Sequence, residues 1–203
     1  MTPTYQFPEL PVLHGAALAH LTDEEFFQLC QDNPQFQLER DAHFNLIIMP
    51  PSHPDASESG GEVVYQMNRW NRTLAPVQGH TYESSAGFKL ANGAIRAPDA
   101  SWLSRDRRTA AAPAGGFLAA CPEFVVEILS PTDRLATTQA KMEEYLANGV
   151  QLGFLLDVAA ETAYVYRPGR APETVPGFDR ELSGEPVLPG FALDLRPLRR
   201  KQG

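Results

Sequence analysis

Three residues in the second half of the chain have types and spacing that suit hydrolysis of a phosphodiester: Asp99, Glu127 and Lys141. Glu127 stands inside the apolar run FVVEILS, where strand alternation places it on one face with Val125 and Leu129. An ionised carboxylate among such neighbours is costly unless a cation compensates it. The position therefore indicates a metal site.

Asp99 supplies a second carboxylate, directly after a predicted strand that ends at Pro98. If this strand neighbours the one that carries Glu127, the two carboxylates can converge on one hard cation, Mg²⁺, with Mn²⁺ as a substitute. Lys141 lies on the helix predicted to follow Glu127, so its ammonium can reach back over the strand end. An ammonium there positions a water and stabilises the charge that develops on phosphorus.

Four further residues are candidates for lesser roles. Glu62 is a possible additional acidic residue, and Ser130, Gln139 and Tyr145 are candidates for support of the site. Asp133, in Ser-Pro-Thr-Asp, is expected to cap the following helix.

Each main candidate also has a structural alternative. Asp99 could close a turn, Glu127 could form a buried ion pair with Arg96, and Lys141 could be an exposed helix lysine. Glu62 could complement the dipole in a first helical turn. A glycosidase using Asp99 and Glu127 as acid and base would need an aromatic-lined cleft, and only Trp102 lies near either motif.

The first half of the chain contains two predicted helices around a hairpin. Thr22 and Glu25 form a capping box that begins a helix over residues 23–31. The apolar runs 36–39 and 44–49 predict a hairpin, and the Pro-, Ser- and Gly-rich residues 50–61 predict a loop. Apolar residues at helical spacing then predict a helix over residues 62–74.

The second half alternates strands with one helix. Asn92-Gly93 predicts a tight turn between strands at 85–90 and 94–98, and residues 124–129 predict a central strand. The helix that follows is closed by Gly149, and two more strands are expected at 152–157 and 163–167. These elements indicate an α/β protein of the α+β mixed-sheet type, with flanking helices and an N-terminal hairpin.

Composition bounds the remaining possibilities. A chain of 203 residues is expected to form one domain, with residues 1–20 as an extended arm. We expect no signal peptide, no membrane association and a cytoplasmic location. The two cysteines form no CxxC pair, and the five histidines have no HExxH spacing. The net charge of -8 opposes a broad grip on nucleic acid, so a local basic rim is expected from six arginines: Arg69, Arg72, Arg96, Arg105, Arg107 and Arg108.

Longer stretches carry a family resemblance: SSAGFKLANGAIRAPDASWL, CPEFVVEILSPTDRLATTQAKMEEYLANGVQLGFLLD, AYVYRPG and EPVLPGFALDL. Together they resemble the Uma-type family of restriction endonucleases, a branch of the PD-(D/E)XK nuclease superfamily, from about residue 20 to about residue 196. The resemblance implies a restriction-endonuclease-like core, a Mg²⁺-dependent endonuclease acting on DNA, and a homodimer. It assigns metal binding to Asp99 and Glu127.

One departure from the superfamily pattern concerns the lysine. The superfamily places a lysine two residues after the acidic one, where this chain has Leu129. Lys141 matches family members in which that lysine has moved to the next helix. The alternative is a catalytically silent nuclease-like fold that acts as a nucleic-acid or protein binding module, for which the missing lysine at position 129 would be the signature.

Overall fold

The computed structural model describes residues 12–13, 15, 18, 20–49, 53–131 and 133–199. The arm predicted over residues 1–20 lies mostly outside this part of the chain. Within the arm, the short strand β1 (Val12–Leu13) pairs antiparallel with β3 (Leu46–Met49).

A six-stranded sheet forms the centre of the molecule, in the order β13-β12-β11-β10-β7-β4. β10 is parallel to β11 and antiparallel to β7, so the sheet is mixed. Its strands are β4 (Gly79–Glu83), β7 (Ala100–Ser104), β10 (Phe124–Ile128), β11 (Leu152–Asp157), β12 (Thr162–Tyr166) and β13 (Glu173–Pro176).

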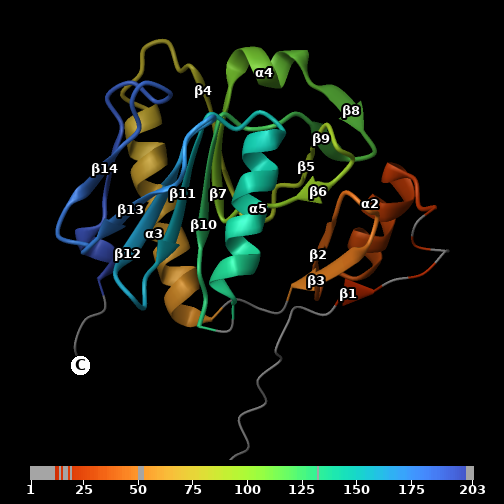
Figure 1. Cartoon of the computed structure of the whole chain (residues 1–203). Helices are drawn as coiled ribbons and strands as arrows, with labels where there is room; N and C mark the ends of the chain where they lie inside the picture. Colours follow the sequence, from red (N-terminus) through yellow and green to blue (C-terminus); the bar gives the residue numbers. More distant parts are fainter. Residues whose placement is uncertain are drawn as a thin grey trace, which may run out of the picture.

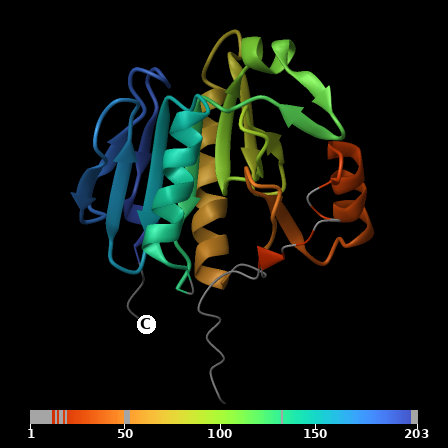
Figure 2. The ribbon, with the colours of Figure 1, turned by 45° about the vertical axis from the view of Figure 1, so that its right-hand side comes forward.

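Two helices cover opposite faces of this six-stranded sheet, as Figures 1 and 2 show. Helix α5 (Leu135–Ala147) lies on one face and α3 (Pro54–Asn71) on the other. The strand β10 separates them because its side chains alternate. Phe124, Val126 and Ile128 pack on the α3 side, whereas Val125 packs with residues of α5.

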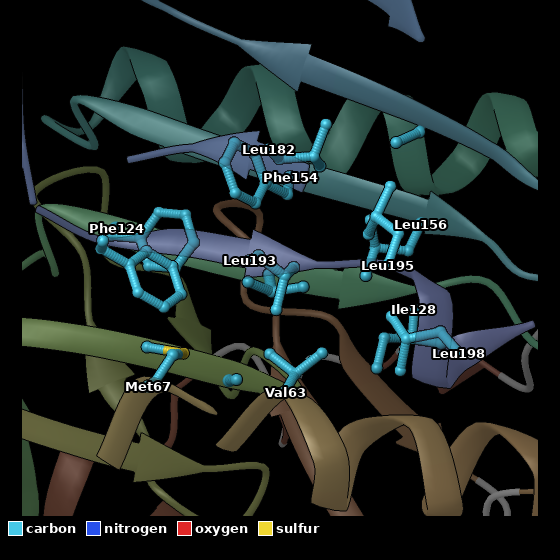
Figure 3. Close-up of a cluster of buried hydrophobic side chains, with 14 of the residues drawn as sticks. Val63, Met67, Phe124, Ile128, Phe154, Leu156, Leu182, Leu193, Leu195 and Leu198 are labelled. Carbon is cyan, nitrogen blue, oxygen red and sulfur yellow. The ribbon is translucent and has the colours of Figure 1, made fainter. Parts of the chain in front are cut away.

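The larger core fills the α3 side, where the C-terminal segments close over the sheet (Figure 3). Val63 and Met67 of α3 contact this cluster, and Leu193 reaches it from the chain's last strand. The closing elements are β14 (Glu181–Ser183), β15 (Ala192–Asp194) and the 3-10 helix η1 (Arg196–Leu198). Burial of these apolar side chains, at roughly 25 cal/mol per Å², holds the sheet against α3.

A second, seven-stranded sheet stands beside the first, in the order β1-β3-β2-β6-β5-β9-β8. Its further strands are β2 (Gln37–Arg40), β5 (Phe88–Lys89), β6 (Ile95–Arg96), β8 (Ala112–Ala114) and β9 (Phe117–Ala119). Helix α2 (Asp23–Asp32) packs on it through Phe26, and the predicted Thr22–Glu25 capping box is present. The short helix α4 (Arg105–Ala110) links the two sheets after β7.

The predicted loop over residues 50–61 is wrong from Pro54 onwards, because α3 begins there. Pro54 lies in the first helical turn, where its missing N–H costs no hydrogen bond. The side chain of His53 caps the helix by accepting the N–H of Asp55. The segment's glycines suggested irregular structure, but tertiary packing of the later apolar stripe extends the helix backwards. The helix also ends earlier than predicted, at Asn71.

Other local predictions agree with the structure. The Asn92-Gly93 turn is present with Gly93 at φ 88°, and Gly149 follows α5 at φ 108°. Asp133, however, does not cap α5: the N-cap is Arg134, and the Asp133 carboxylate instead accepts the Ser130 N–H. The mixed sheets with their flanking helices confirm the predicted α+β class. Within the described residues, the helices are too short or too polar to cross a membrane.

Candidate active site

Asp99 and Glu127 lie on neighbouring strands of the six-stranded sheet. The ladder pairs Val126 of β10 with Ala100 of β7. Asp99 immediately precedes Ala100 and Glu127 immediately follows Val126, so the two acids lie at the same end of these antiparallel strands. Sequence reasoning placed Asp99 at the end of the preceding hairpin. The structure places it immediately before β7, and this strand is the neighbour of β10.

Both acids line a pocket of about 660 Å³ between the two sheets, α3 and α5, called here the acidic pocket. Its ionisable lining is dominated by carboxylates. The acids are Glu39, Asp41, Glu83, Asp99, Glu127, Asp133 and Glu144, against the cations Arg96 and Lys141. A surplus of negative charge in one concave site favours a divalent cation.

Glu127 is 6% exposed, and one of its oxygens is fully committed. Its Oε1 contacts Lys141 Nζ at 2.9 Å and accepts a hydrogen bond from the Tyr145 hydroxyl at 3.0 Å. Burial raises the pKa of Glu127 to about 7; the Lys141 ammonium opposes this shift, and the Asp99 carboxylate adds to it. Near neutral pH this group is poised to exchange a proton for a cation.

Asp99 is held to the same strand by the main chain. Its Oδ2 accepts the N–H of Ile128 at 2.7 Å. Burial raises the pKa of Asp99, although the Lys141 ammonium and the Ile128 N–H both favour its ionised form. Among the described residues, no donor hydrogen-bonds to Oδ1 of Asp99 or to Oε2 of Glu127. Each acid therefore keeps one oxygen for another partner.

Lys141 extends from the middle of α5 into the acidic pocket, where its side chain is 14% exposed. Its ammonium contacts Glu127 and also Glu39 Oε1, each at 2.9 Å. Burial alone would lower the pKa of Lys141, but the carboxylates of Glu127 and Glu39 outweigh burial and raise it. These carboxylates therefore favour the charged form of the side chain, and because it is largely buried the alternative of an exposed helix lysine is wrong.

Glu39 is the site residue that sequence reasoning missed. It lies on β2 in the seven-stranded sheet, is 2% exposed, and accepts the Ala97 N–H at 3.0 Å in addition to its contact with Lys141. Its other oxygen pairs with Arg96 at 3.0 Å. Burial would raise the pKa of Glu39, but Lys141 and Arg96 overcome this effect and lower it. The available signal was weak: a charged residue at the end of the short predicted strand 36–39.

Arg96 does not pair with Glu127, so that alternative is wrong. Its guanidinium bridges Glu39 and Glu144, the latter at 2.6 Å. Arg96 is also the one arginine of the predicted basic rim among the described residues that line the acidic pocket. Arg107 is instead paired with Glu123 beside α4.

The candidates for support divide into two groups. Ser130 lines the acidic pocket, and Tyr145 fixes Glu127. Gln139 lies near Tyr166 and outside the pocket lining. Glu62 is also outside it and accepts a hydrogen bond from Gln66, whose amide contacts the carbonyl of Asp194. Helix α3 therefore turns Glu62 towards the C-terminal segments.

The donor set fits a hard divalent cation. Asp99 and Glu127 each offer one uncommitted oxygen, and oxygen ligands suit Mg²⁺ and Mn²⁺. No group of three or more His, Cys, Asp or Glu side chains in the described part of the chain is arranged to enclose a metal. Mg²⁺ accepts such a site because it is commonly held by one or two carboxylates, with waters and substrate phosphate completing its shell.

Comparisons with known proteins give the family and the fold of the chain. A family model described as "Uma2: Putative restriction endonuclease" matches residues 23–196. Among solved structures, the chain is similar to one titled as "a putative nuclease belonging to DUF820 from Anabaena variabilis ATCC 29413", with a TM-score of 0.72 and 21% sequence identity. That match covers 88% of this chain and 97% of the other, and it shows the shared fold. No curated protein matches the sequence.

Proposed function

Because the chain belongs to the Uma2 family of restriction endonucleases, we propose that it is a Mg²⁺-dependent endonuclease that hydrolyses phosphodiester bonds of DNA. The observation that carries this proposal is the contact between Lys141 and Glu127 at 2.9 Å. It supplies an ammonium beside the buried acid, although the strand itself has Leu129 at the usual lysine position. This contact supports a role for Lys141 in place of the lysine that is missing at position 129.

The residues of the acidic pocket would divide the work. Asp99 and Glu127 would hold the cation through their uncommitted oxygens, and Mg²⁺ when bound supplies the positive charge that polarises the phosphate and acidifies a neighbouring water. Lys141 would orient the attacking water and stabilise charge on the phosphoryl oxygens. Tyr145 would keep Glu127 in place, since its hydroxyl donates to Oε1.

The charge of the pocket makes substrate binding depend on metal. Seven carboxylates and two cations line it, so an anionic phosphate is repelled until a divalent cation is bound. We therefore expect affinity for DNA at the site to appear only with Mg²⁺, Mn²⁺ or another divalent cation. A homodimer in the cytoplasm would bring two such pockets to the two strands of a duplex.

The test is cleavage of supercoiled plasmid and of labelled single- and double-stranded DNA, with Mg²⁺, with Mn²⁺ and with EDTA. The parent should nick plasmid only with a divalent cation. Asp99→Asn, Glu127→Gln and Lys141→Met should each lower kcat by about 10²- to 10³-fold. Matched controls are Glu62→Gln and Lys89→Met, which lie outside the acidic pocket and should cut like the parent.

Two outcomes would reject the proposal. A Lys141→Met protein that cuts as well as the parent would remove the ammonium from the mechanism. The catalytically silent binding module would be favoured if the parent bound DNA equally with EDTA and with Mg²⁺ and cut none of the DNA substrates. Isothermal titration of Mg²⁺ separates these cases further, because binding should require both Asp99 and Glu127.

A further inference from the structure

We infer that Glu39 is a positioning residue that acts through Lys141, fixing the direction in which the ammonium presents its remaining N–H. This inference rests on the proposed function. Glu39 and Lys141 are 102 positions apart in the chain and belong to β2 and α5, yet their side chains meet at 2.9 Å. The contact joins the seven-stranded sheet to the helix of the six-stranded sheet.

The geometry of an ammonium explains why a second carboxylate matters. A lysine ammonium has three N–H donors on a flexible four-carbon stem. With Glu127 as its one acceptor, it would rotate about that hydrogen bond and sample several directions. With Glu127 and Glu39 both at 2.9 Å, two donors are fixed, and the third has a defined direction. Positioned donors of this kind stabilise a transition state without reorganisation.

Glu39 is itself held in place before any substrate arrives. The Ala97 N–H and Lys141 occupy Oε1, and Arg96 occupies Oε2. Arg96 is fixed in turn by Glu144, which also accepts a hydrogen bond from Asn92 in the turn between β5 and β6. Apart from Lys141, the carboxylate thus has two anchors of its own, the Ala97 N–H and Arg96, which hold it in place if the lysine moves.

The same contacts argue that Glu39 is not a metal ligand. Both of its oxygens are occupied by cations or by a main-chain N–H. Asp99 and Glu127, in contrast, each retain a free oxygen among the described residues. Glu39 therefore positions the Lys141 ammonium, whereas Asp99 and Glu127 are the candidate ligands of the divalent cation.

The experiment is a double-mutant cycle on plasmid cleavage with the full chain. Glu39→Gln should lower kcat by about 10- to 100-fold with KM changed less than about threefold, since a misdirected donor affects the reaction step and not ground-state binding. In a Lys141→Met background, the same change should have no further effect on kcat. Titration of Mg²⁺ should give Glu39→Gln an affinity within a few-fold of the parent, whereas Glu127→Gln loses binding.

Asp23→Asn is the matched control. Asp23 is a half-buried carboxylate that is likewise shared by two cations, Arg40 and Lys89, and it lies outside the acidic pocket. Loss of its charge should destabilise the fold and leave kcat at the parent value. If Glu39→Gln fails to fold, Glu39→Gln combined with Arg96→Gln removes both opposing charges and takes its place in the cycle.

A metal-free readout separates this inference from the proposed function. The chain has three lysines, at 89, 141 and 201, so the ¹⁵N ammonium signal of Lys141 can be assigned by substitution. In EDTA it should be protected from exchange in the parent and lost in Glu39→Gln. The positioning role would be overturned if Glu39→Gln left the ammonium signal or kcat unchanged. It would also be overturned if Glu39→Gln lowered kcat equally in the parent and in the Lys141→Met background. A parent that cuts no DNA would reject the proposed function, while the ammonium signal would still decide the role of Glu39.

Discussion

The Asp99 carboxylate is hydrogen-bonded to the strand that carries Glu127: its Oδ2 accepts the Ile128 N–H at 2.7 Å. The residue pairing of β7 with β10 stops at Ala100 and Val126, and the Asp99 side chain continues the connection beyond that point. The separation of the two acids is therefore set by the strand backbones. This main-chain connection orients both acids before any ligand binds, which limits the reorganisation that catalysis requires.

The stability of the metal-free protein should depend on the protonation of Glu127. Its pKa is about 7 in the folded protein and near 4.5 in the unfolded chain. The folded state then holds a proton that the unfolded state releases, so this contribution is complete below pH 4.5 and is lost as pH rises through about 7. Relative to Glu127→Gln, the parent's free energy of unfolding should fall by on the order of 3 kcal/mol across this window. Urea unfolding in EDTA at several pH values measures this difference, and a pH-independent difference would contradict it.

Mg²⁺ should counteract this loss. A cation that binds the ionised site stabilises the folded protein according to its concentration relative to Kd. The Tm of the parent at pH 8 should rise when Mg²⁺ replaces EDTA, whereas the Tm of Glu127→Gln should not change. A Tm increase of equal size in both proteins would indicate cation binding elsewhere.

Tyr145 should matter for the site more than for the core. Its hydroxyl donates to Glu127 Oε1 at 3.0 Å, and the residue is fully buried. Tyr145→Phe keeps the ring and removes one hydrogen bond to a charged acceptor, so we expect a loss of about 1 to 2 kcal/mol in stability. The same substitution should also lower kcat, because Glu127 loses one of its two fixed contacts. Tyr65→Phe, at a position 57% exposed on α3, is the control and should leave both quantities unchanged.

Two substitutions of Gly61 in α3 should distinguish an effect on stability from an effect on substrate access. Gly61 lines the acidic pocket inside a helix, and a Cβ built there meets no atom within 4 Å. Gly61→Ala should therefore stabilise the protein by roughly 0.5 to 1 kcal/mol, because alanine loses less conformational freedom on folding. Gly61→Phe should fill the pocket and weaken DNA binding in the presence of Ca²⁺. An alanine variant with a lower Tm would show that the helix needs glycine for another reason.

Arg40 should be essential to the seven-stranded sheet. It is 2% exposed, pairs with Asp23 at 2.6 Å, and lies over the ring of Phe44 at 4.7 Å. Arg40→Met removes a buried ion-pair partner and should cost about 3 kcal/mol. Lys89→Met, at the more exposed partner of the same aspartate, should cost less than about 1 kcal/mol. Equal costs in calorimetry would show that the aspartate, not burial of the arginine, dominates.

The sequence was informative where the determining contacts are local. The strand, turn and helix from Phe124 to Gly149 could be predicted because alternation, helical spacing and a terminal glycine agree within one short stretch. Within the same stretch, Glu127 stood out as the single charged residue of an apolar strand. The resemblance of longer segments then supplied Lys141, which spacing alone left open.

Contacts between distant elements were beyond such reasoning. Glu39 ends an ordinary hairpin strand in the sequence, and its role exists only because β2 faces α5. The start of α3 was missed for a related reason: its local composition favours a loop, and packing against the six-stranded sheet overrides that preference. Glu62 was misplaced because the rotation of α3 about its axis is set by that packing.

The two carboxylates that grip Lys141 belong to different sheets, Glu127 to the six-stranded one and Glu39 to the seven-stranded one. The proposed activity therefore depends on how the two sheets pack together. Local unfolding of the seven-stranded sheet would release Glu39 from Lys141 and abolish activity while the six-stranded sheet stays folded. Enzymatic activity should accordingly disappear at a lower urea concentration than the helical circular dichroism signal of the chain, which comes largely from α3 and α5.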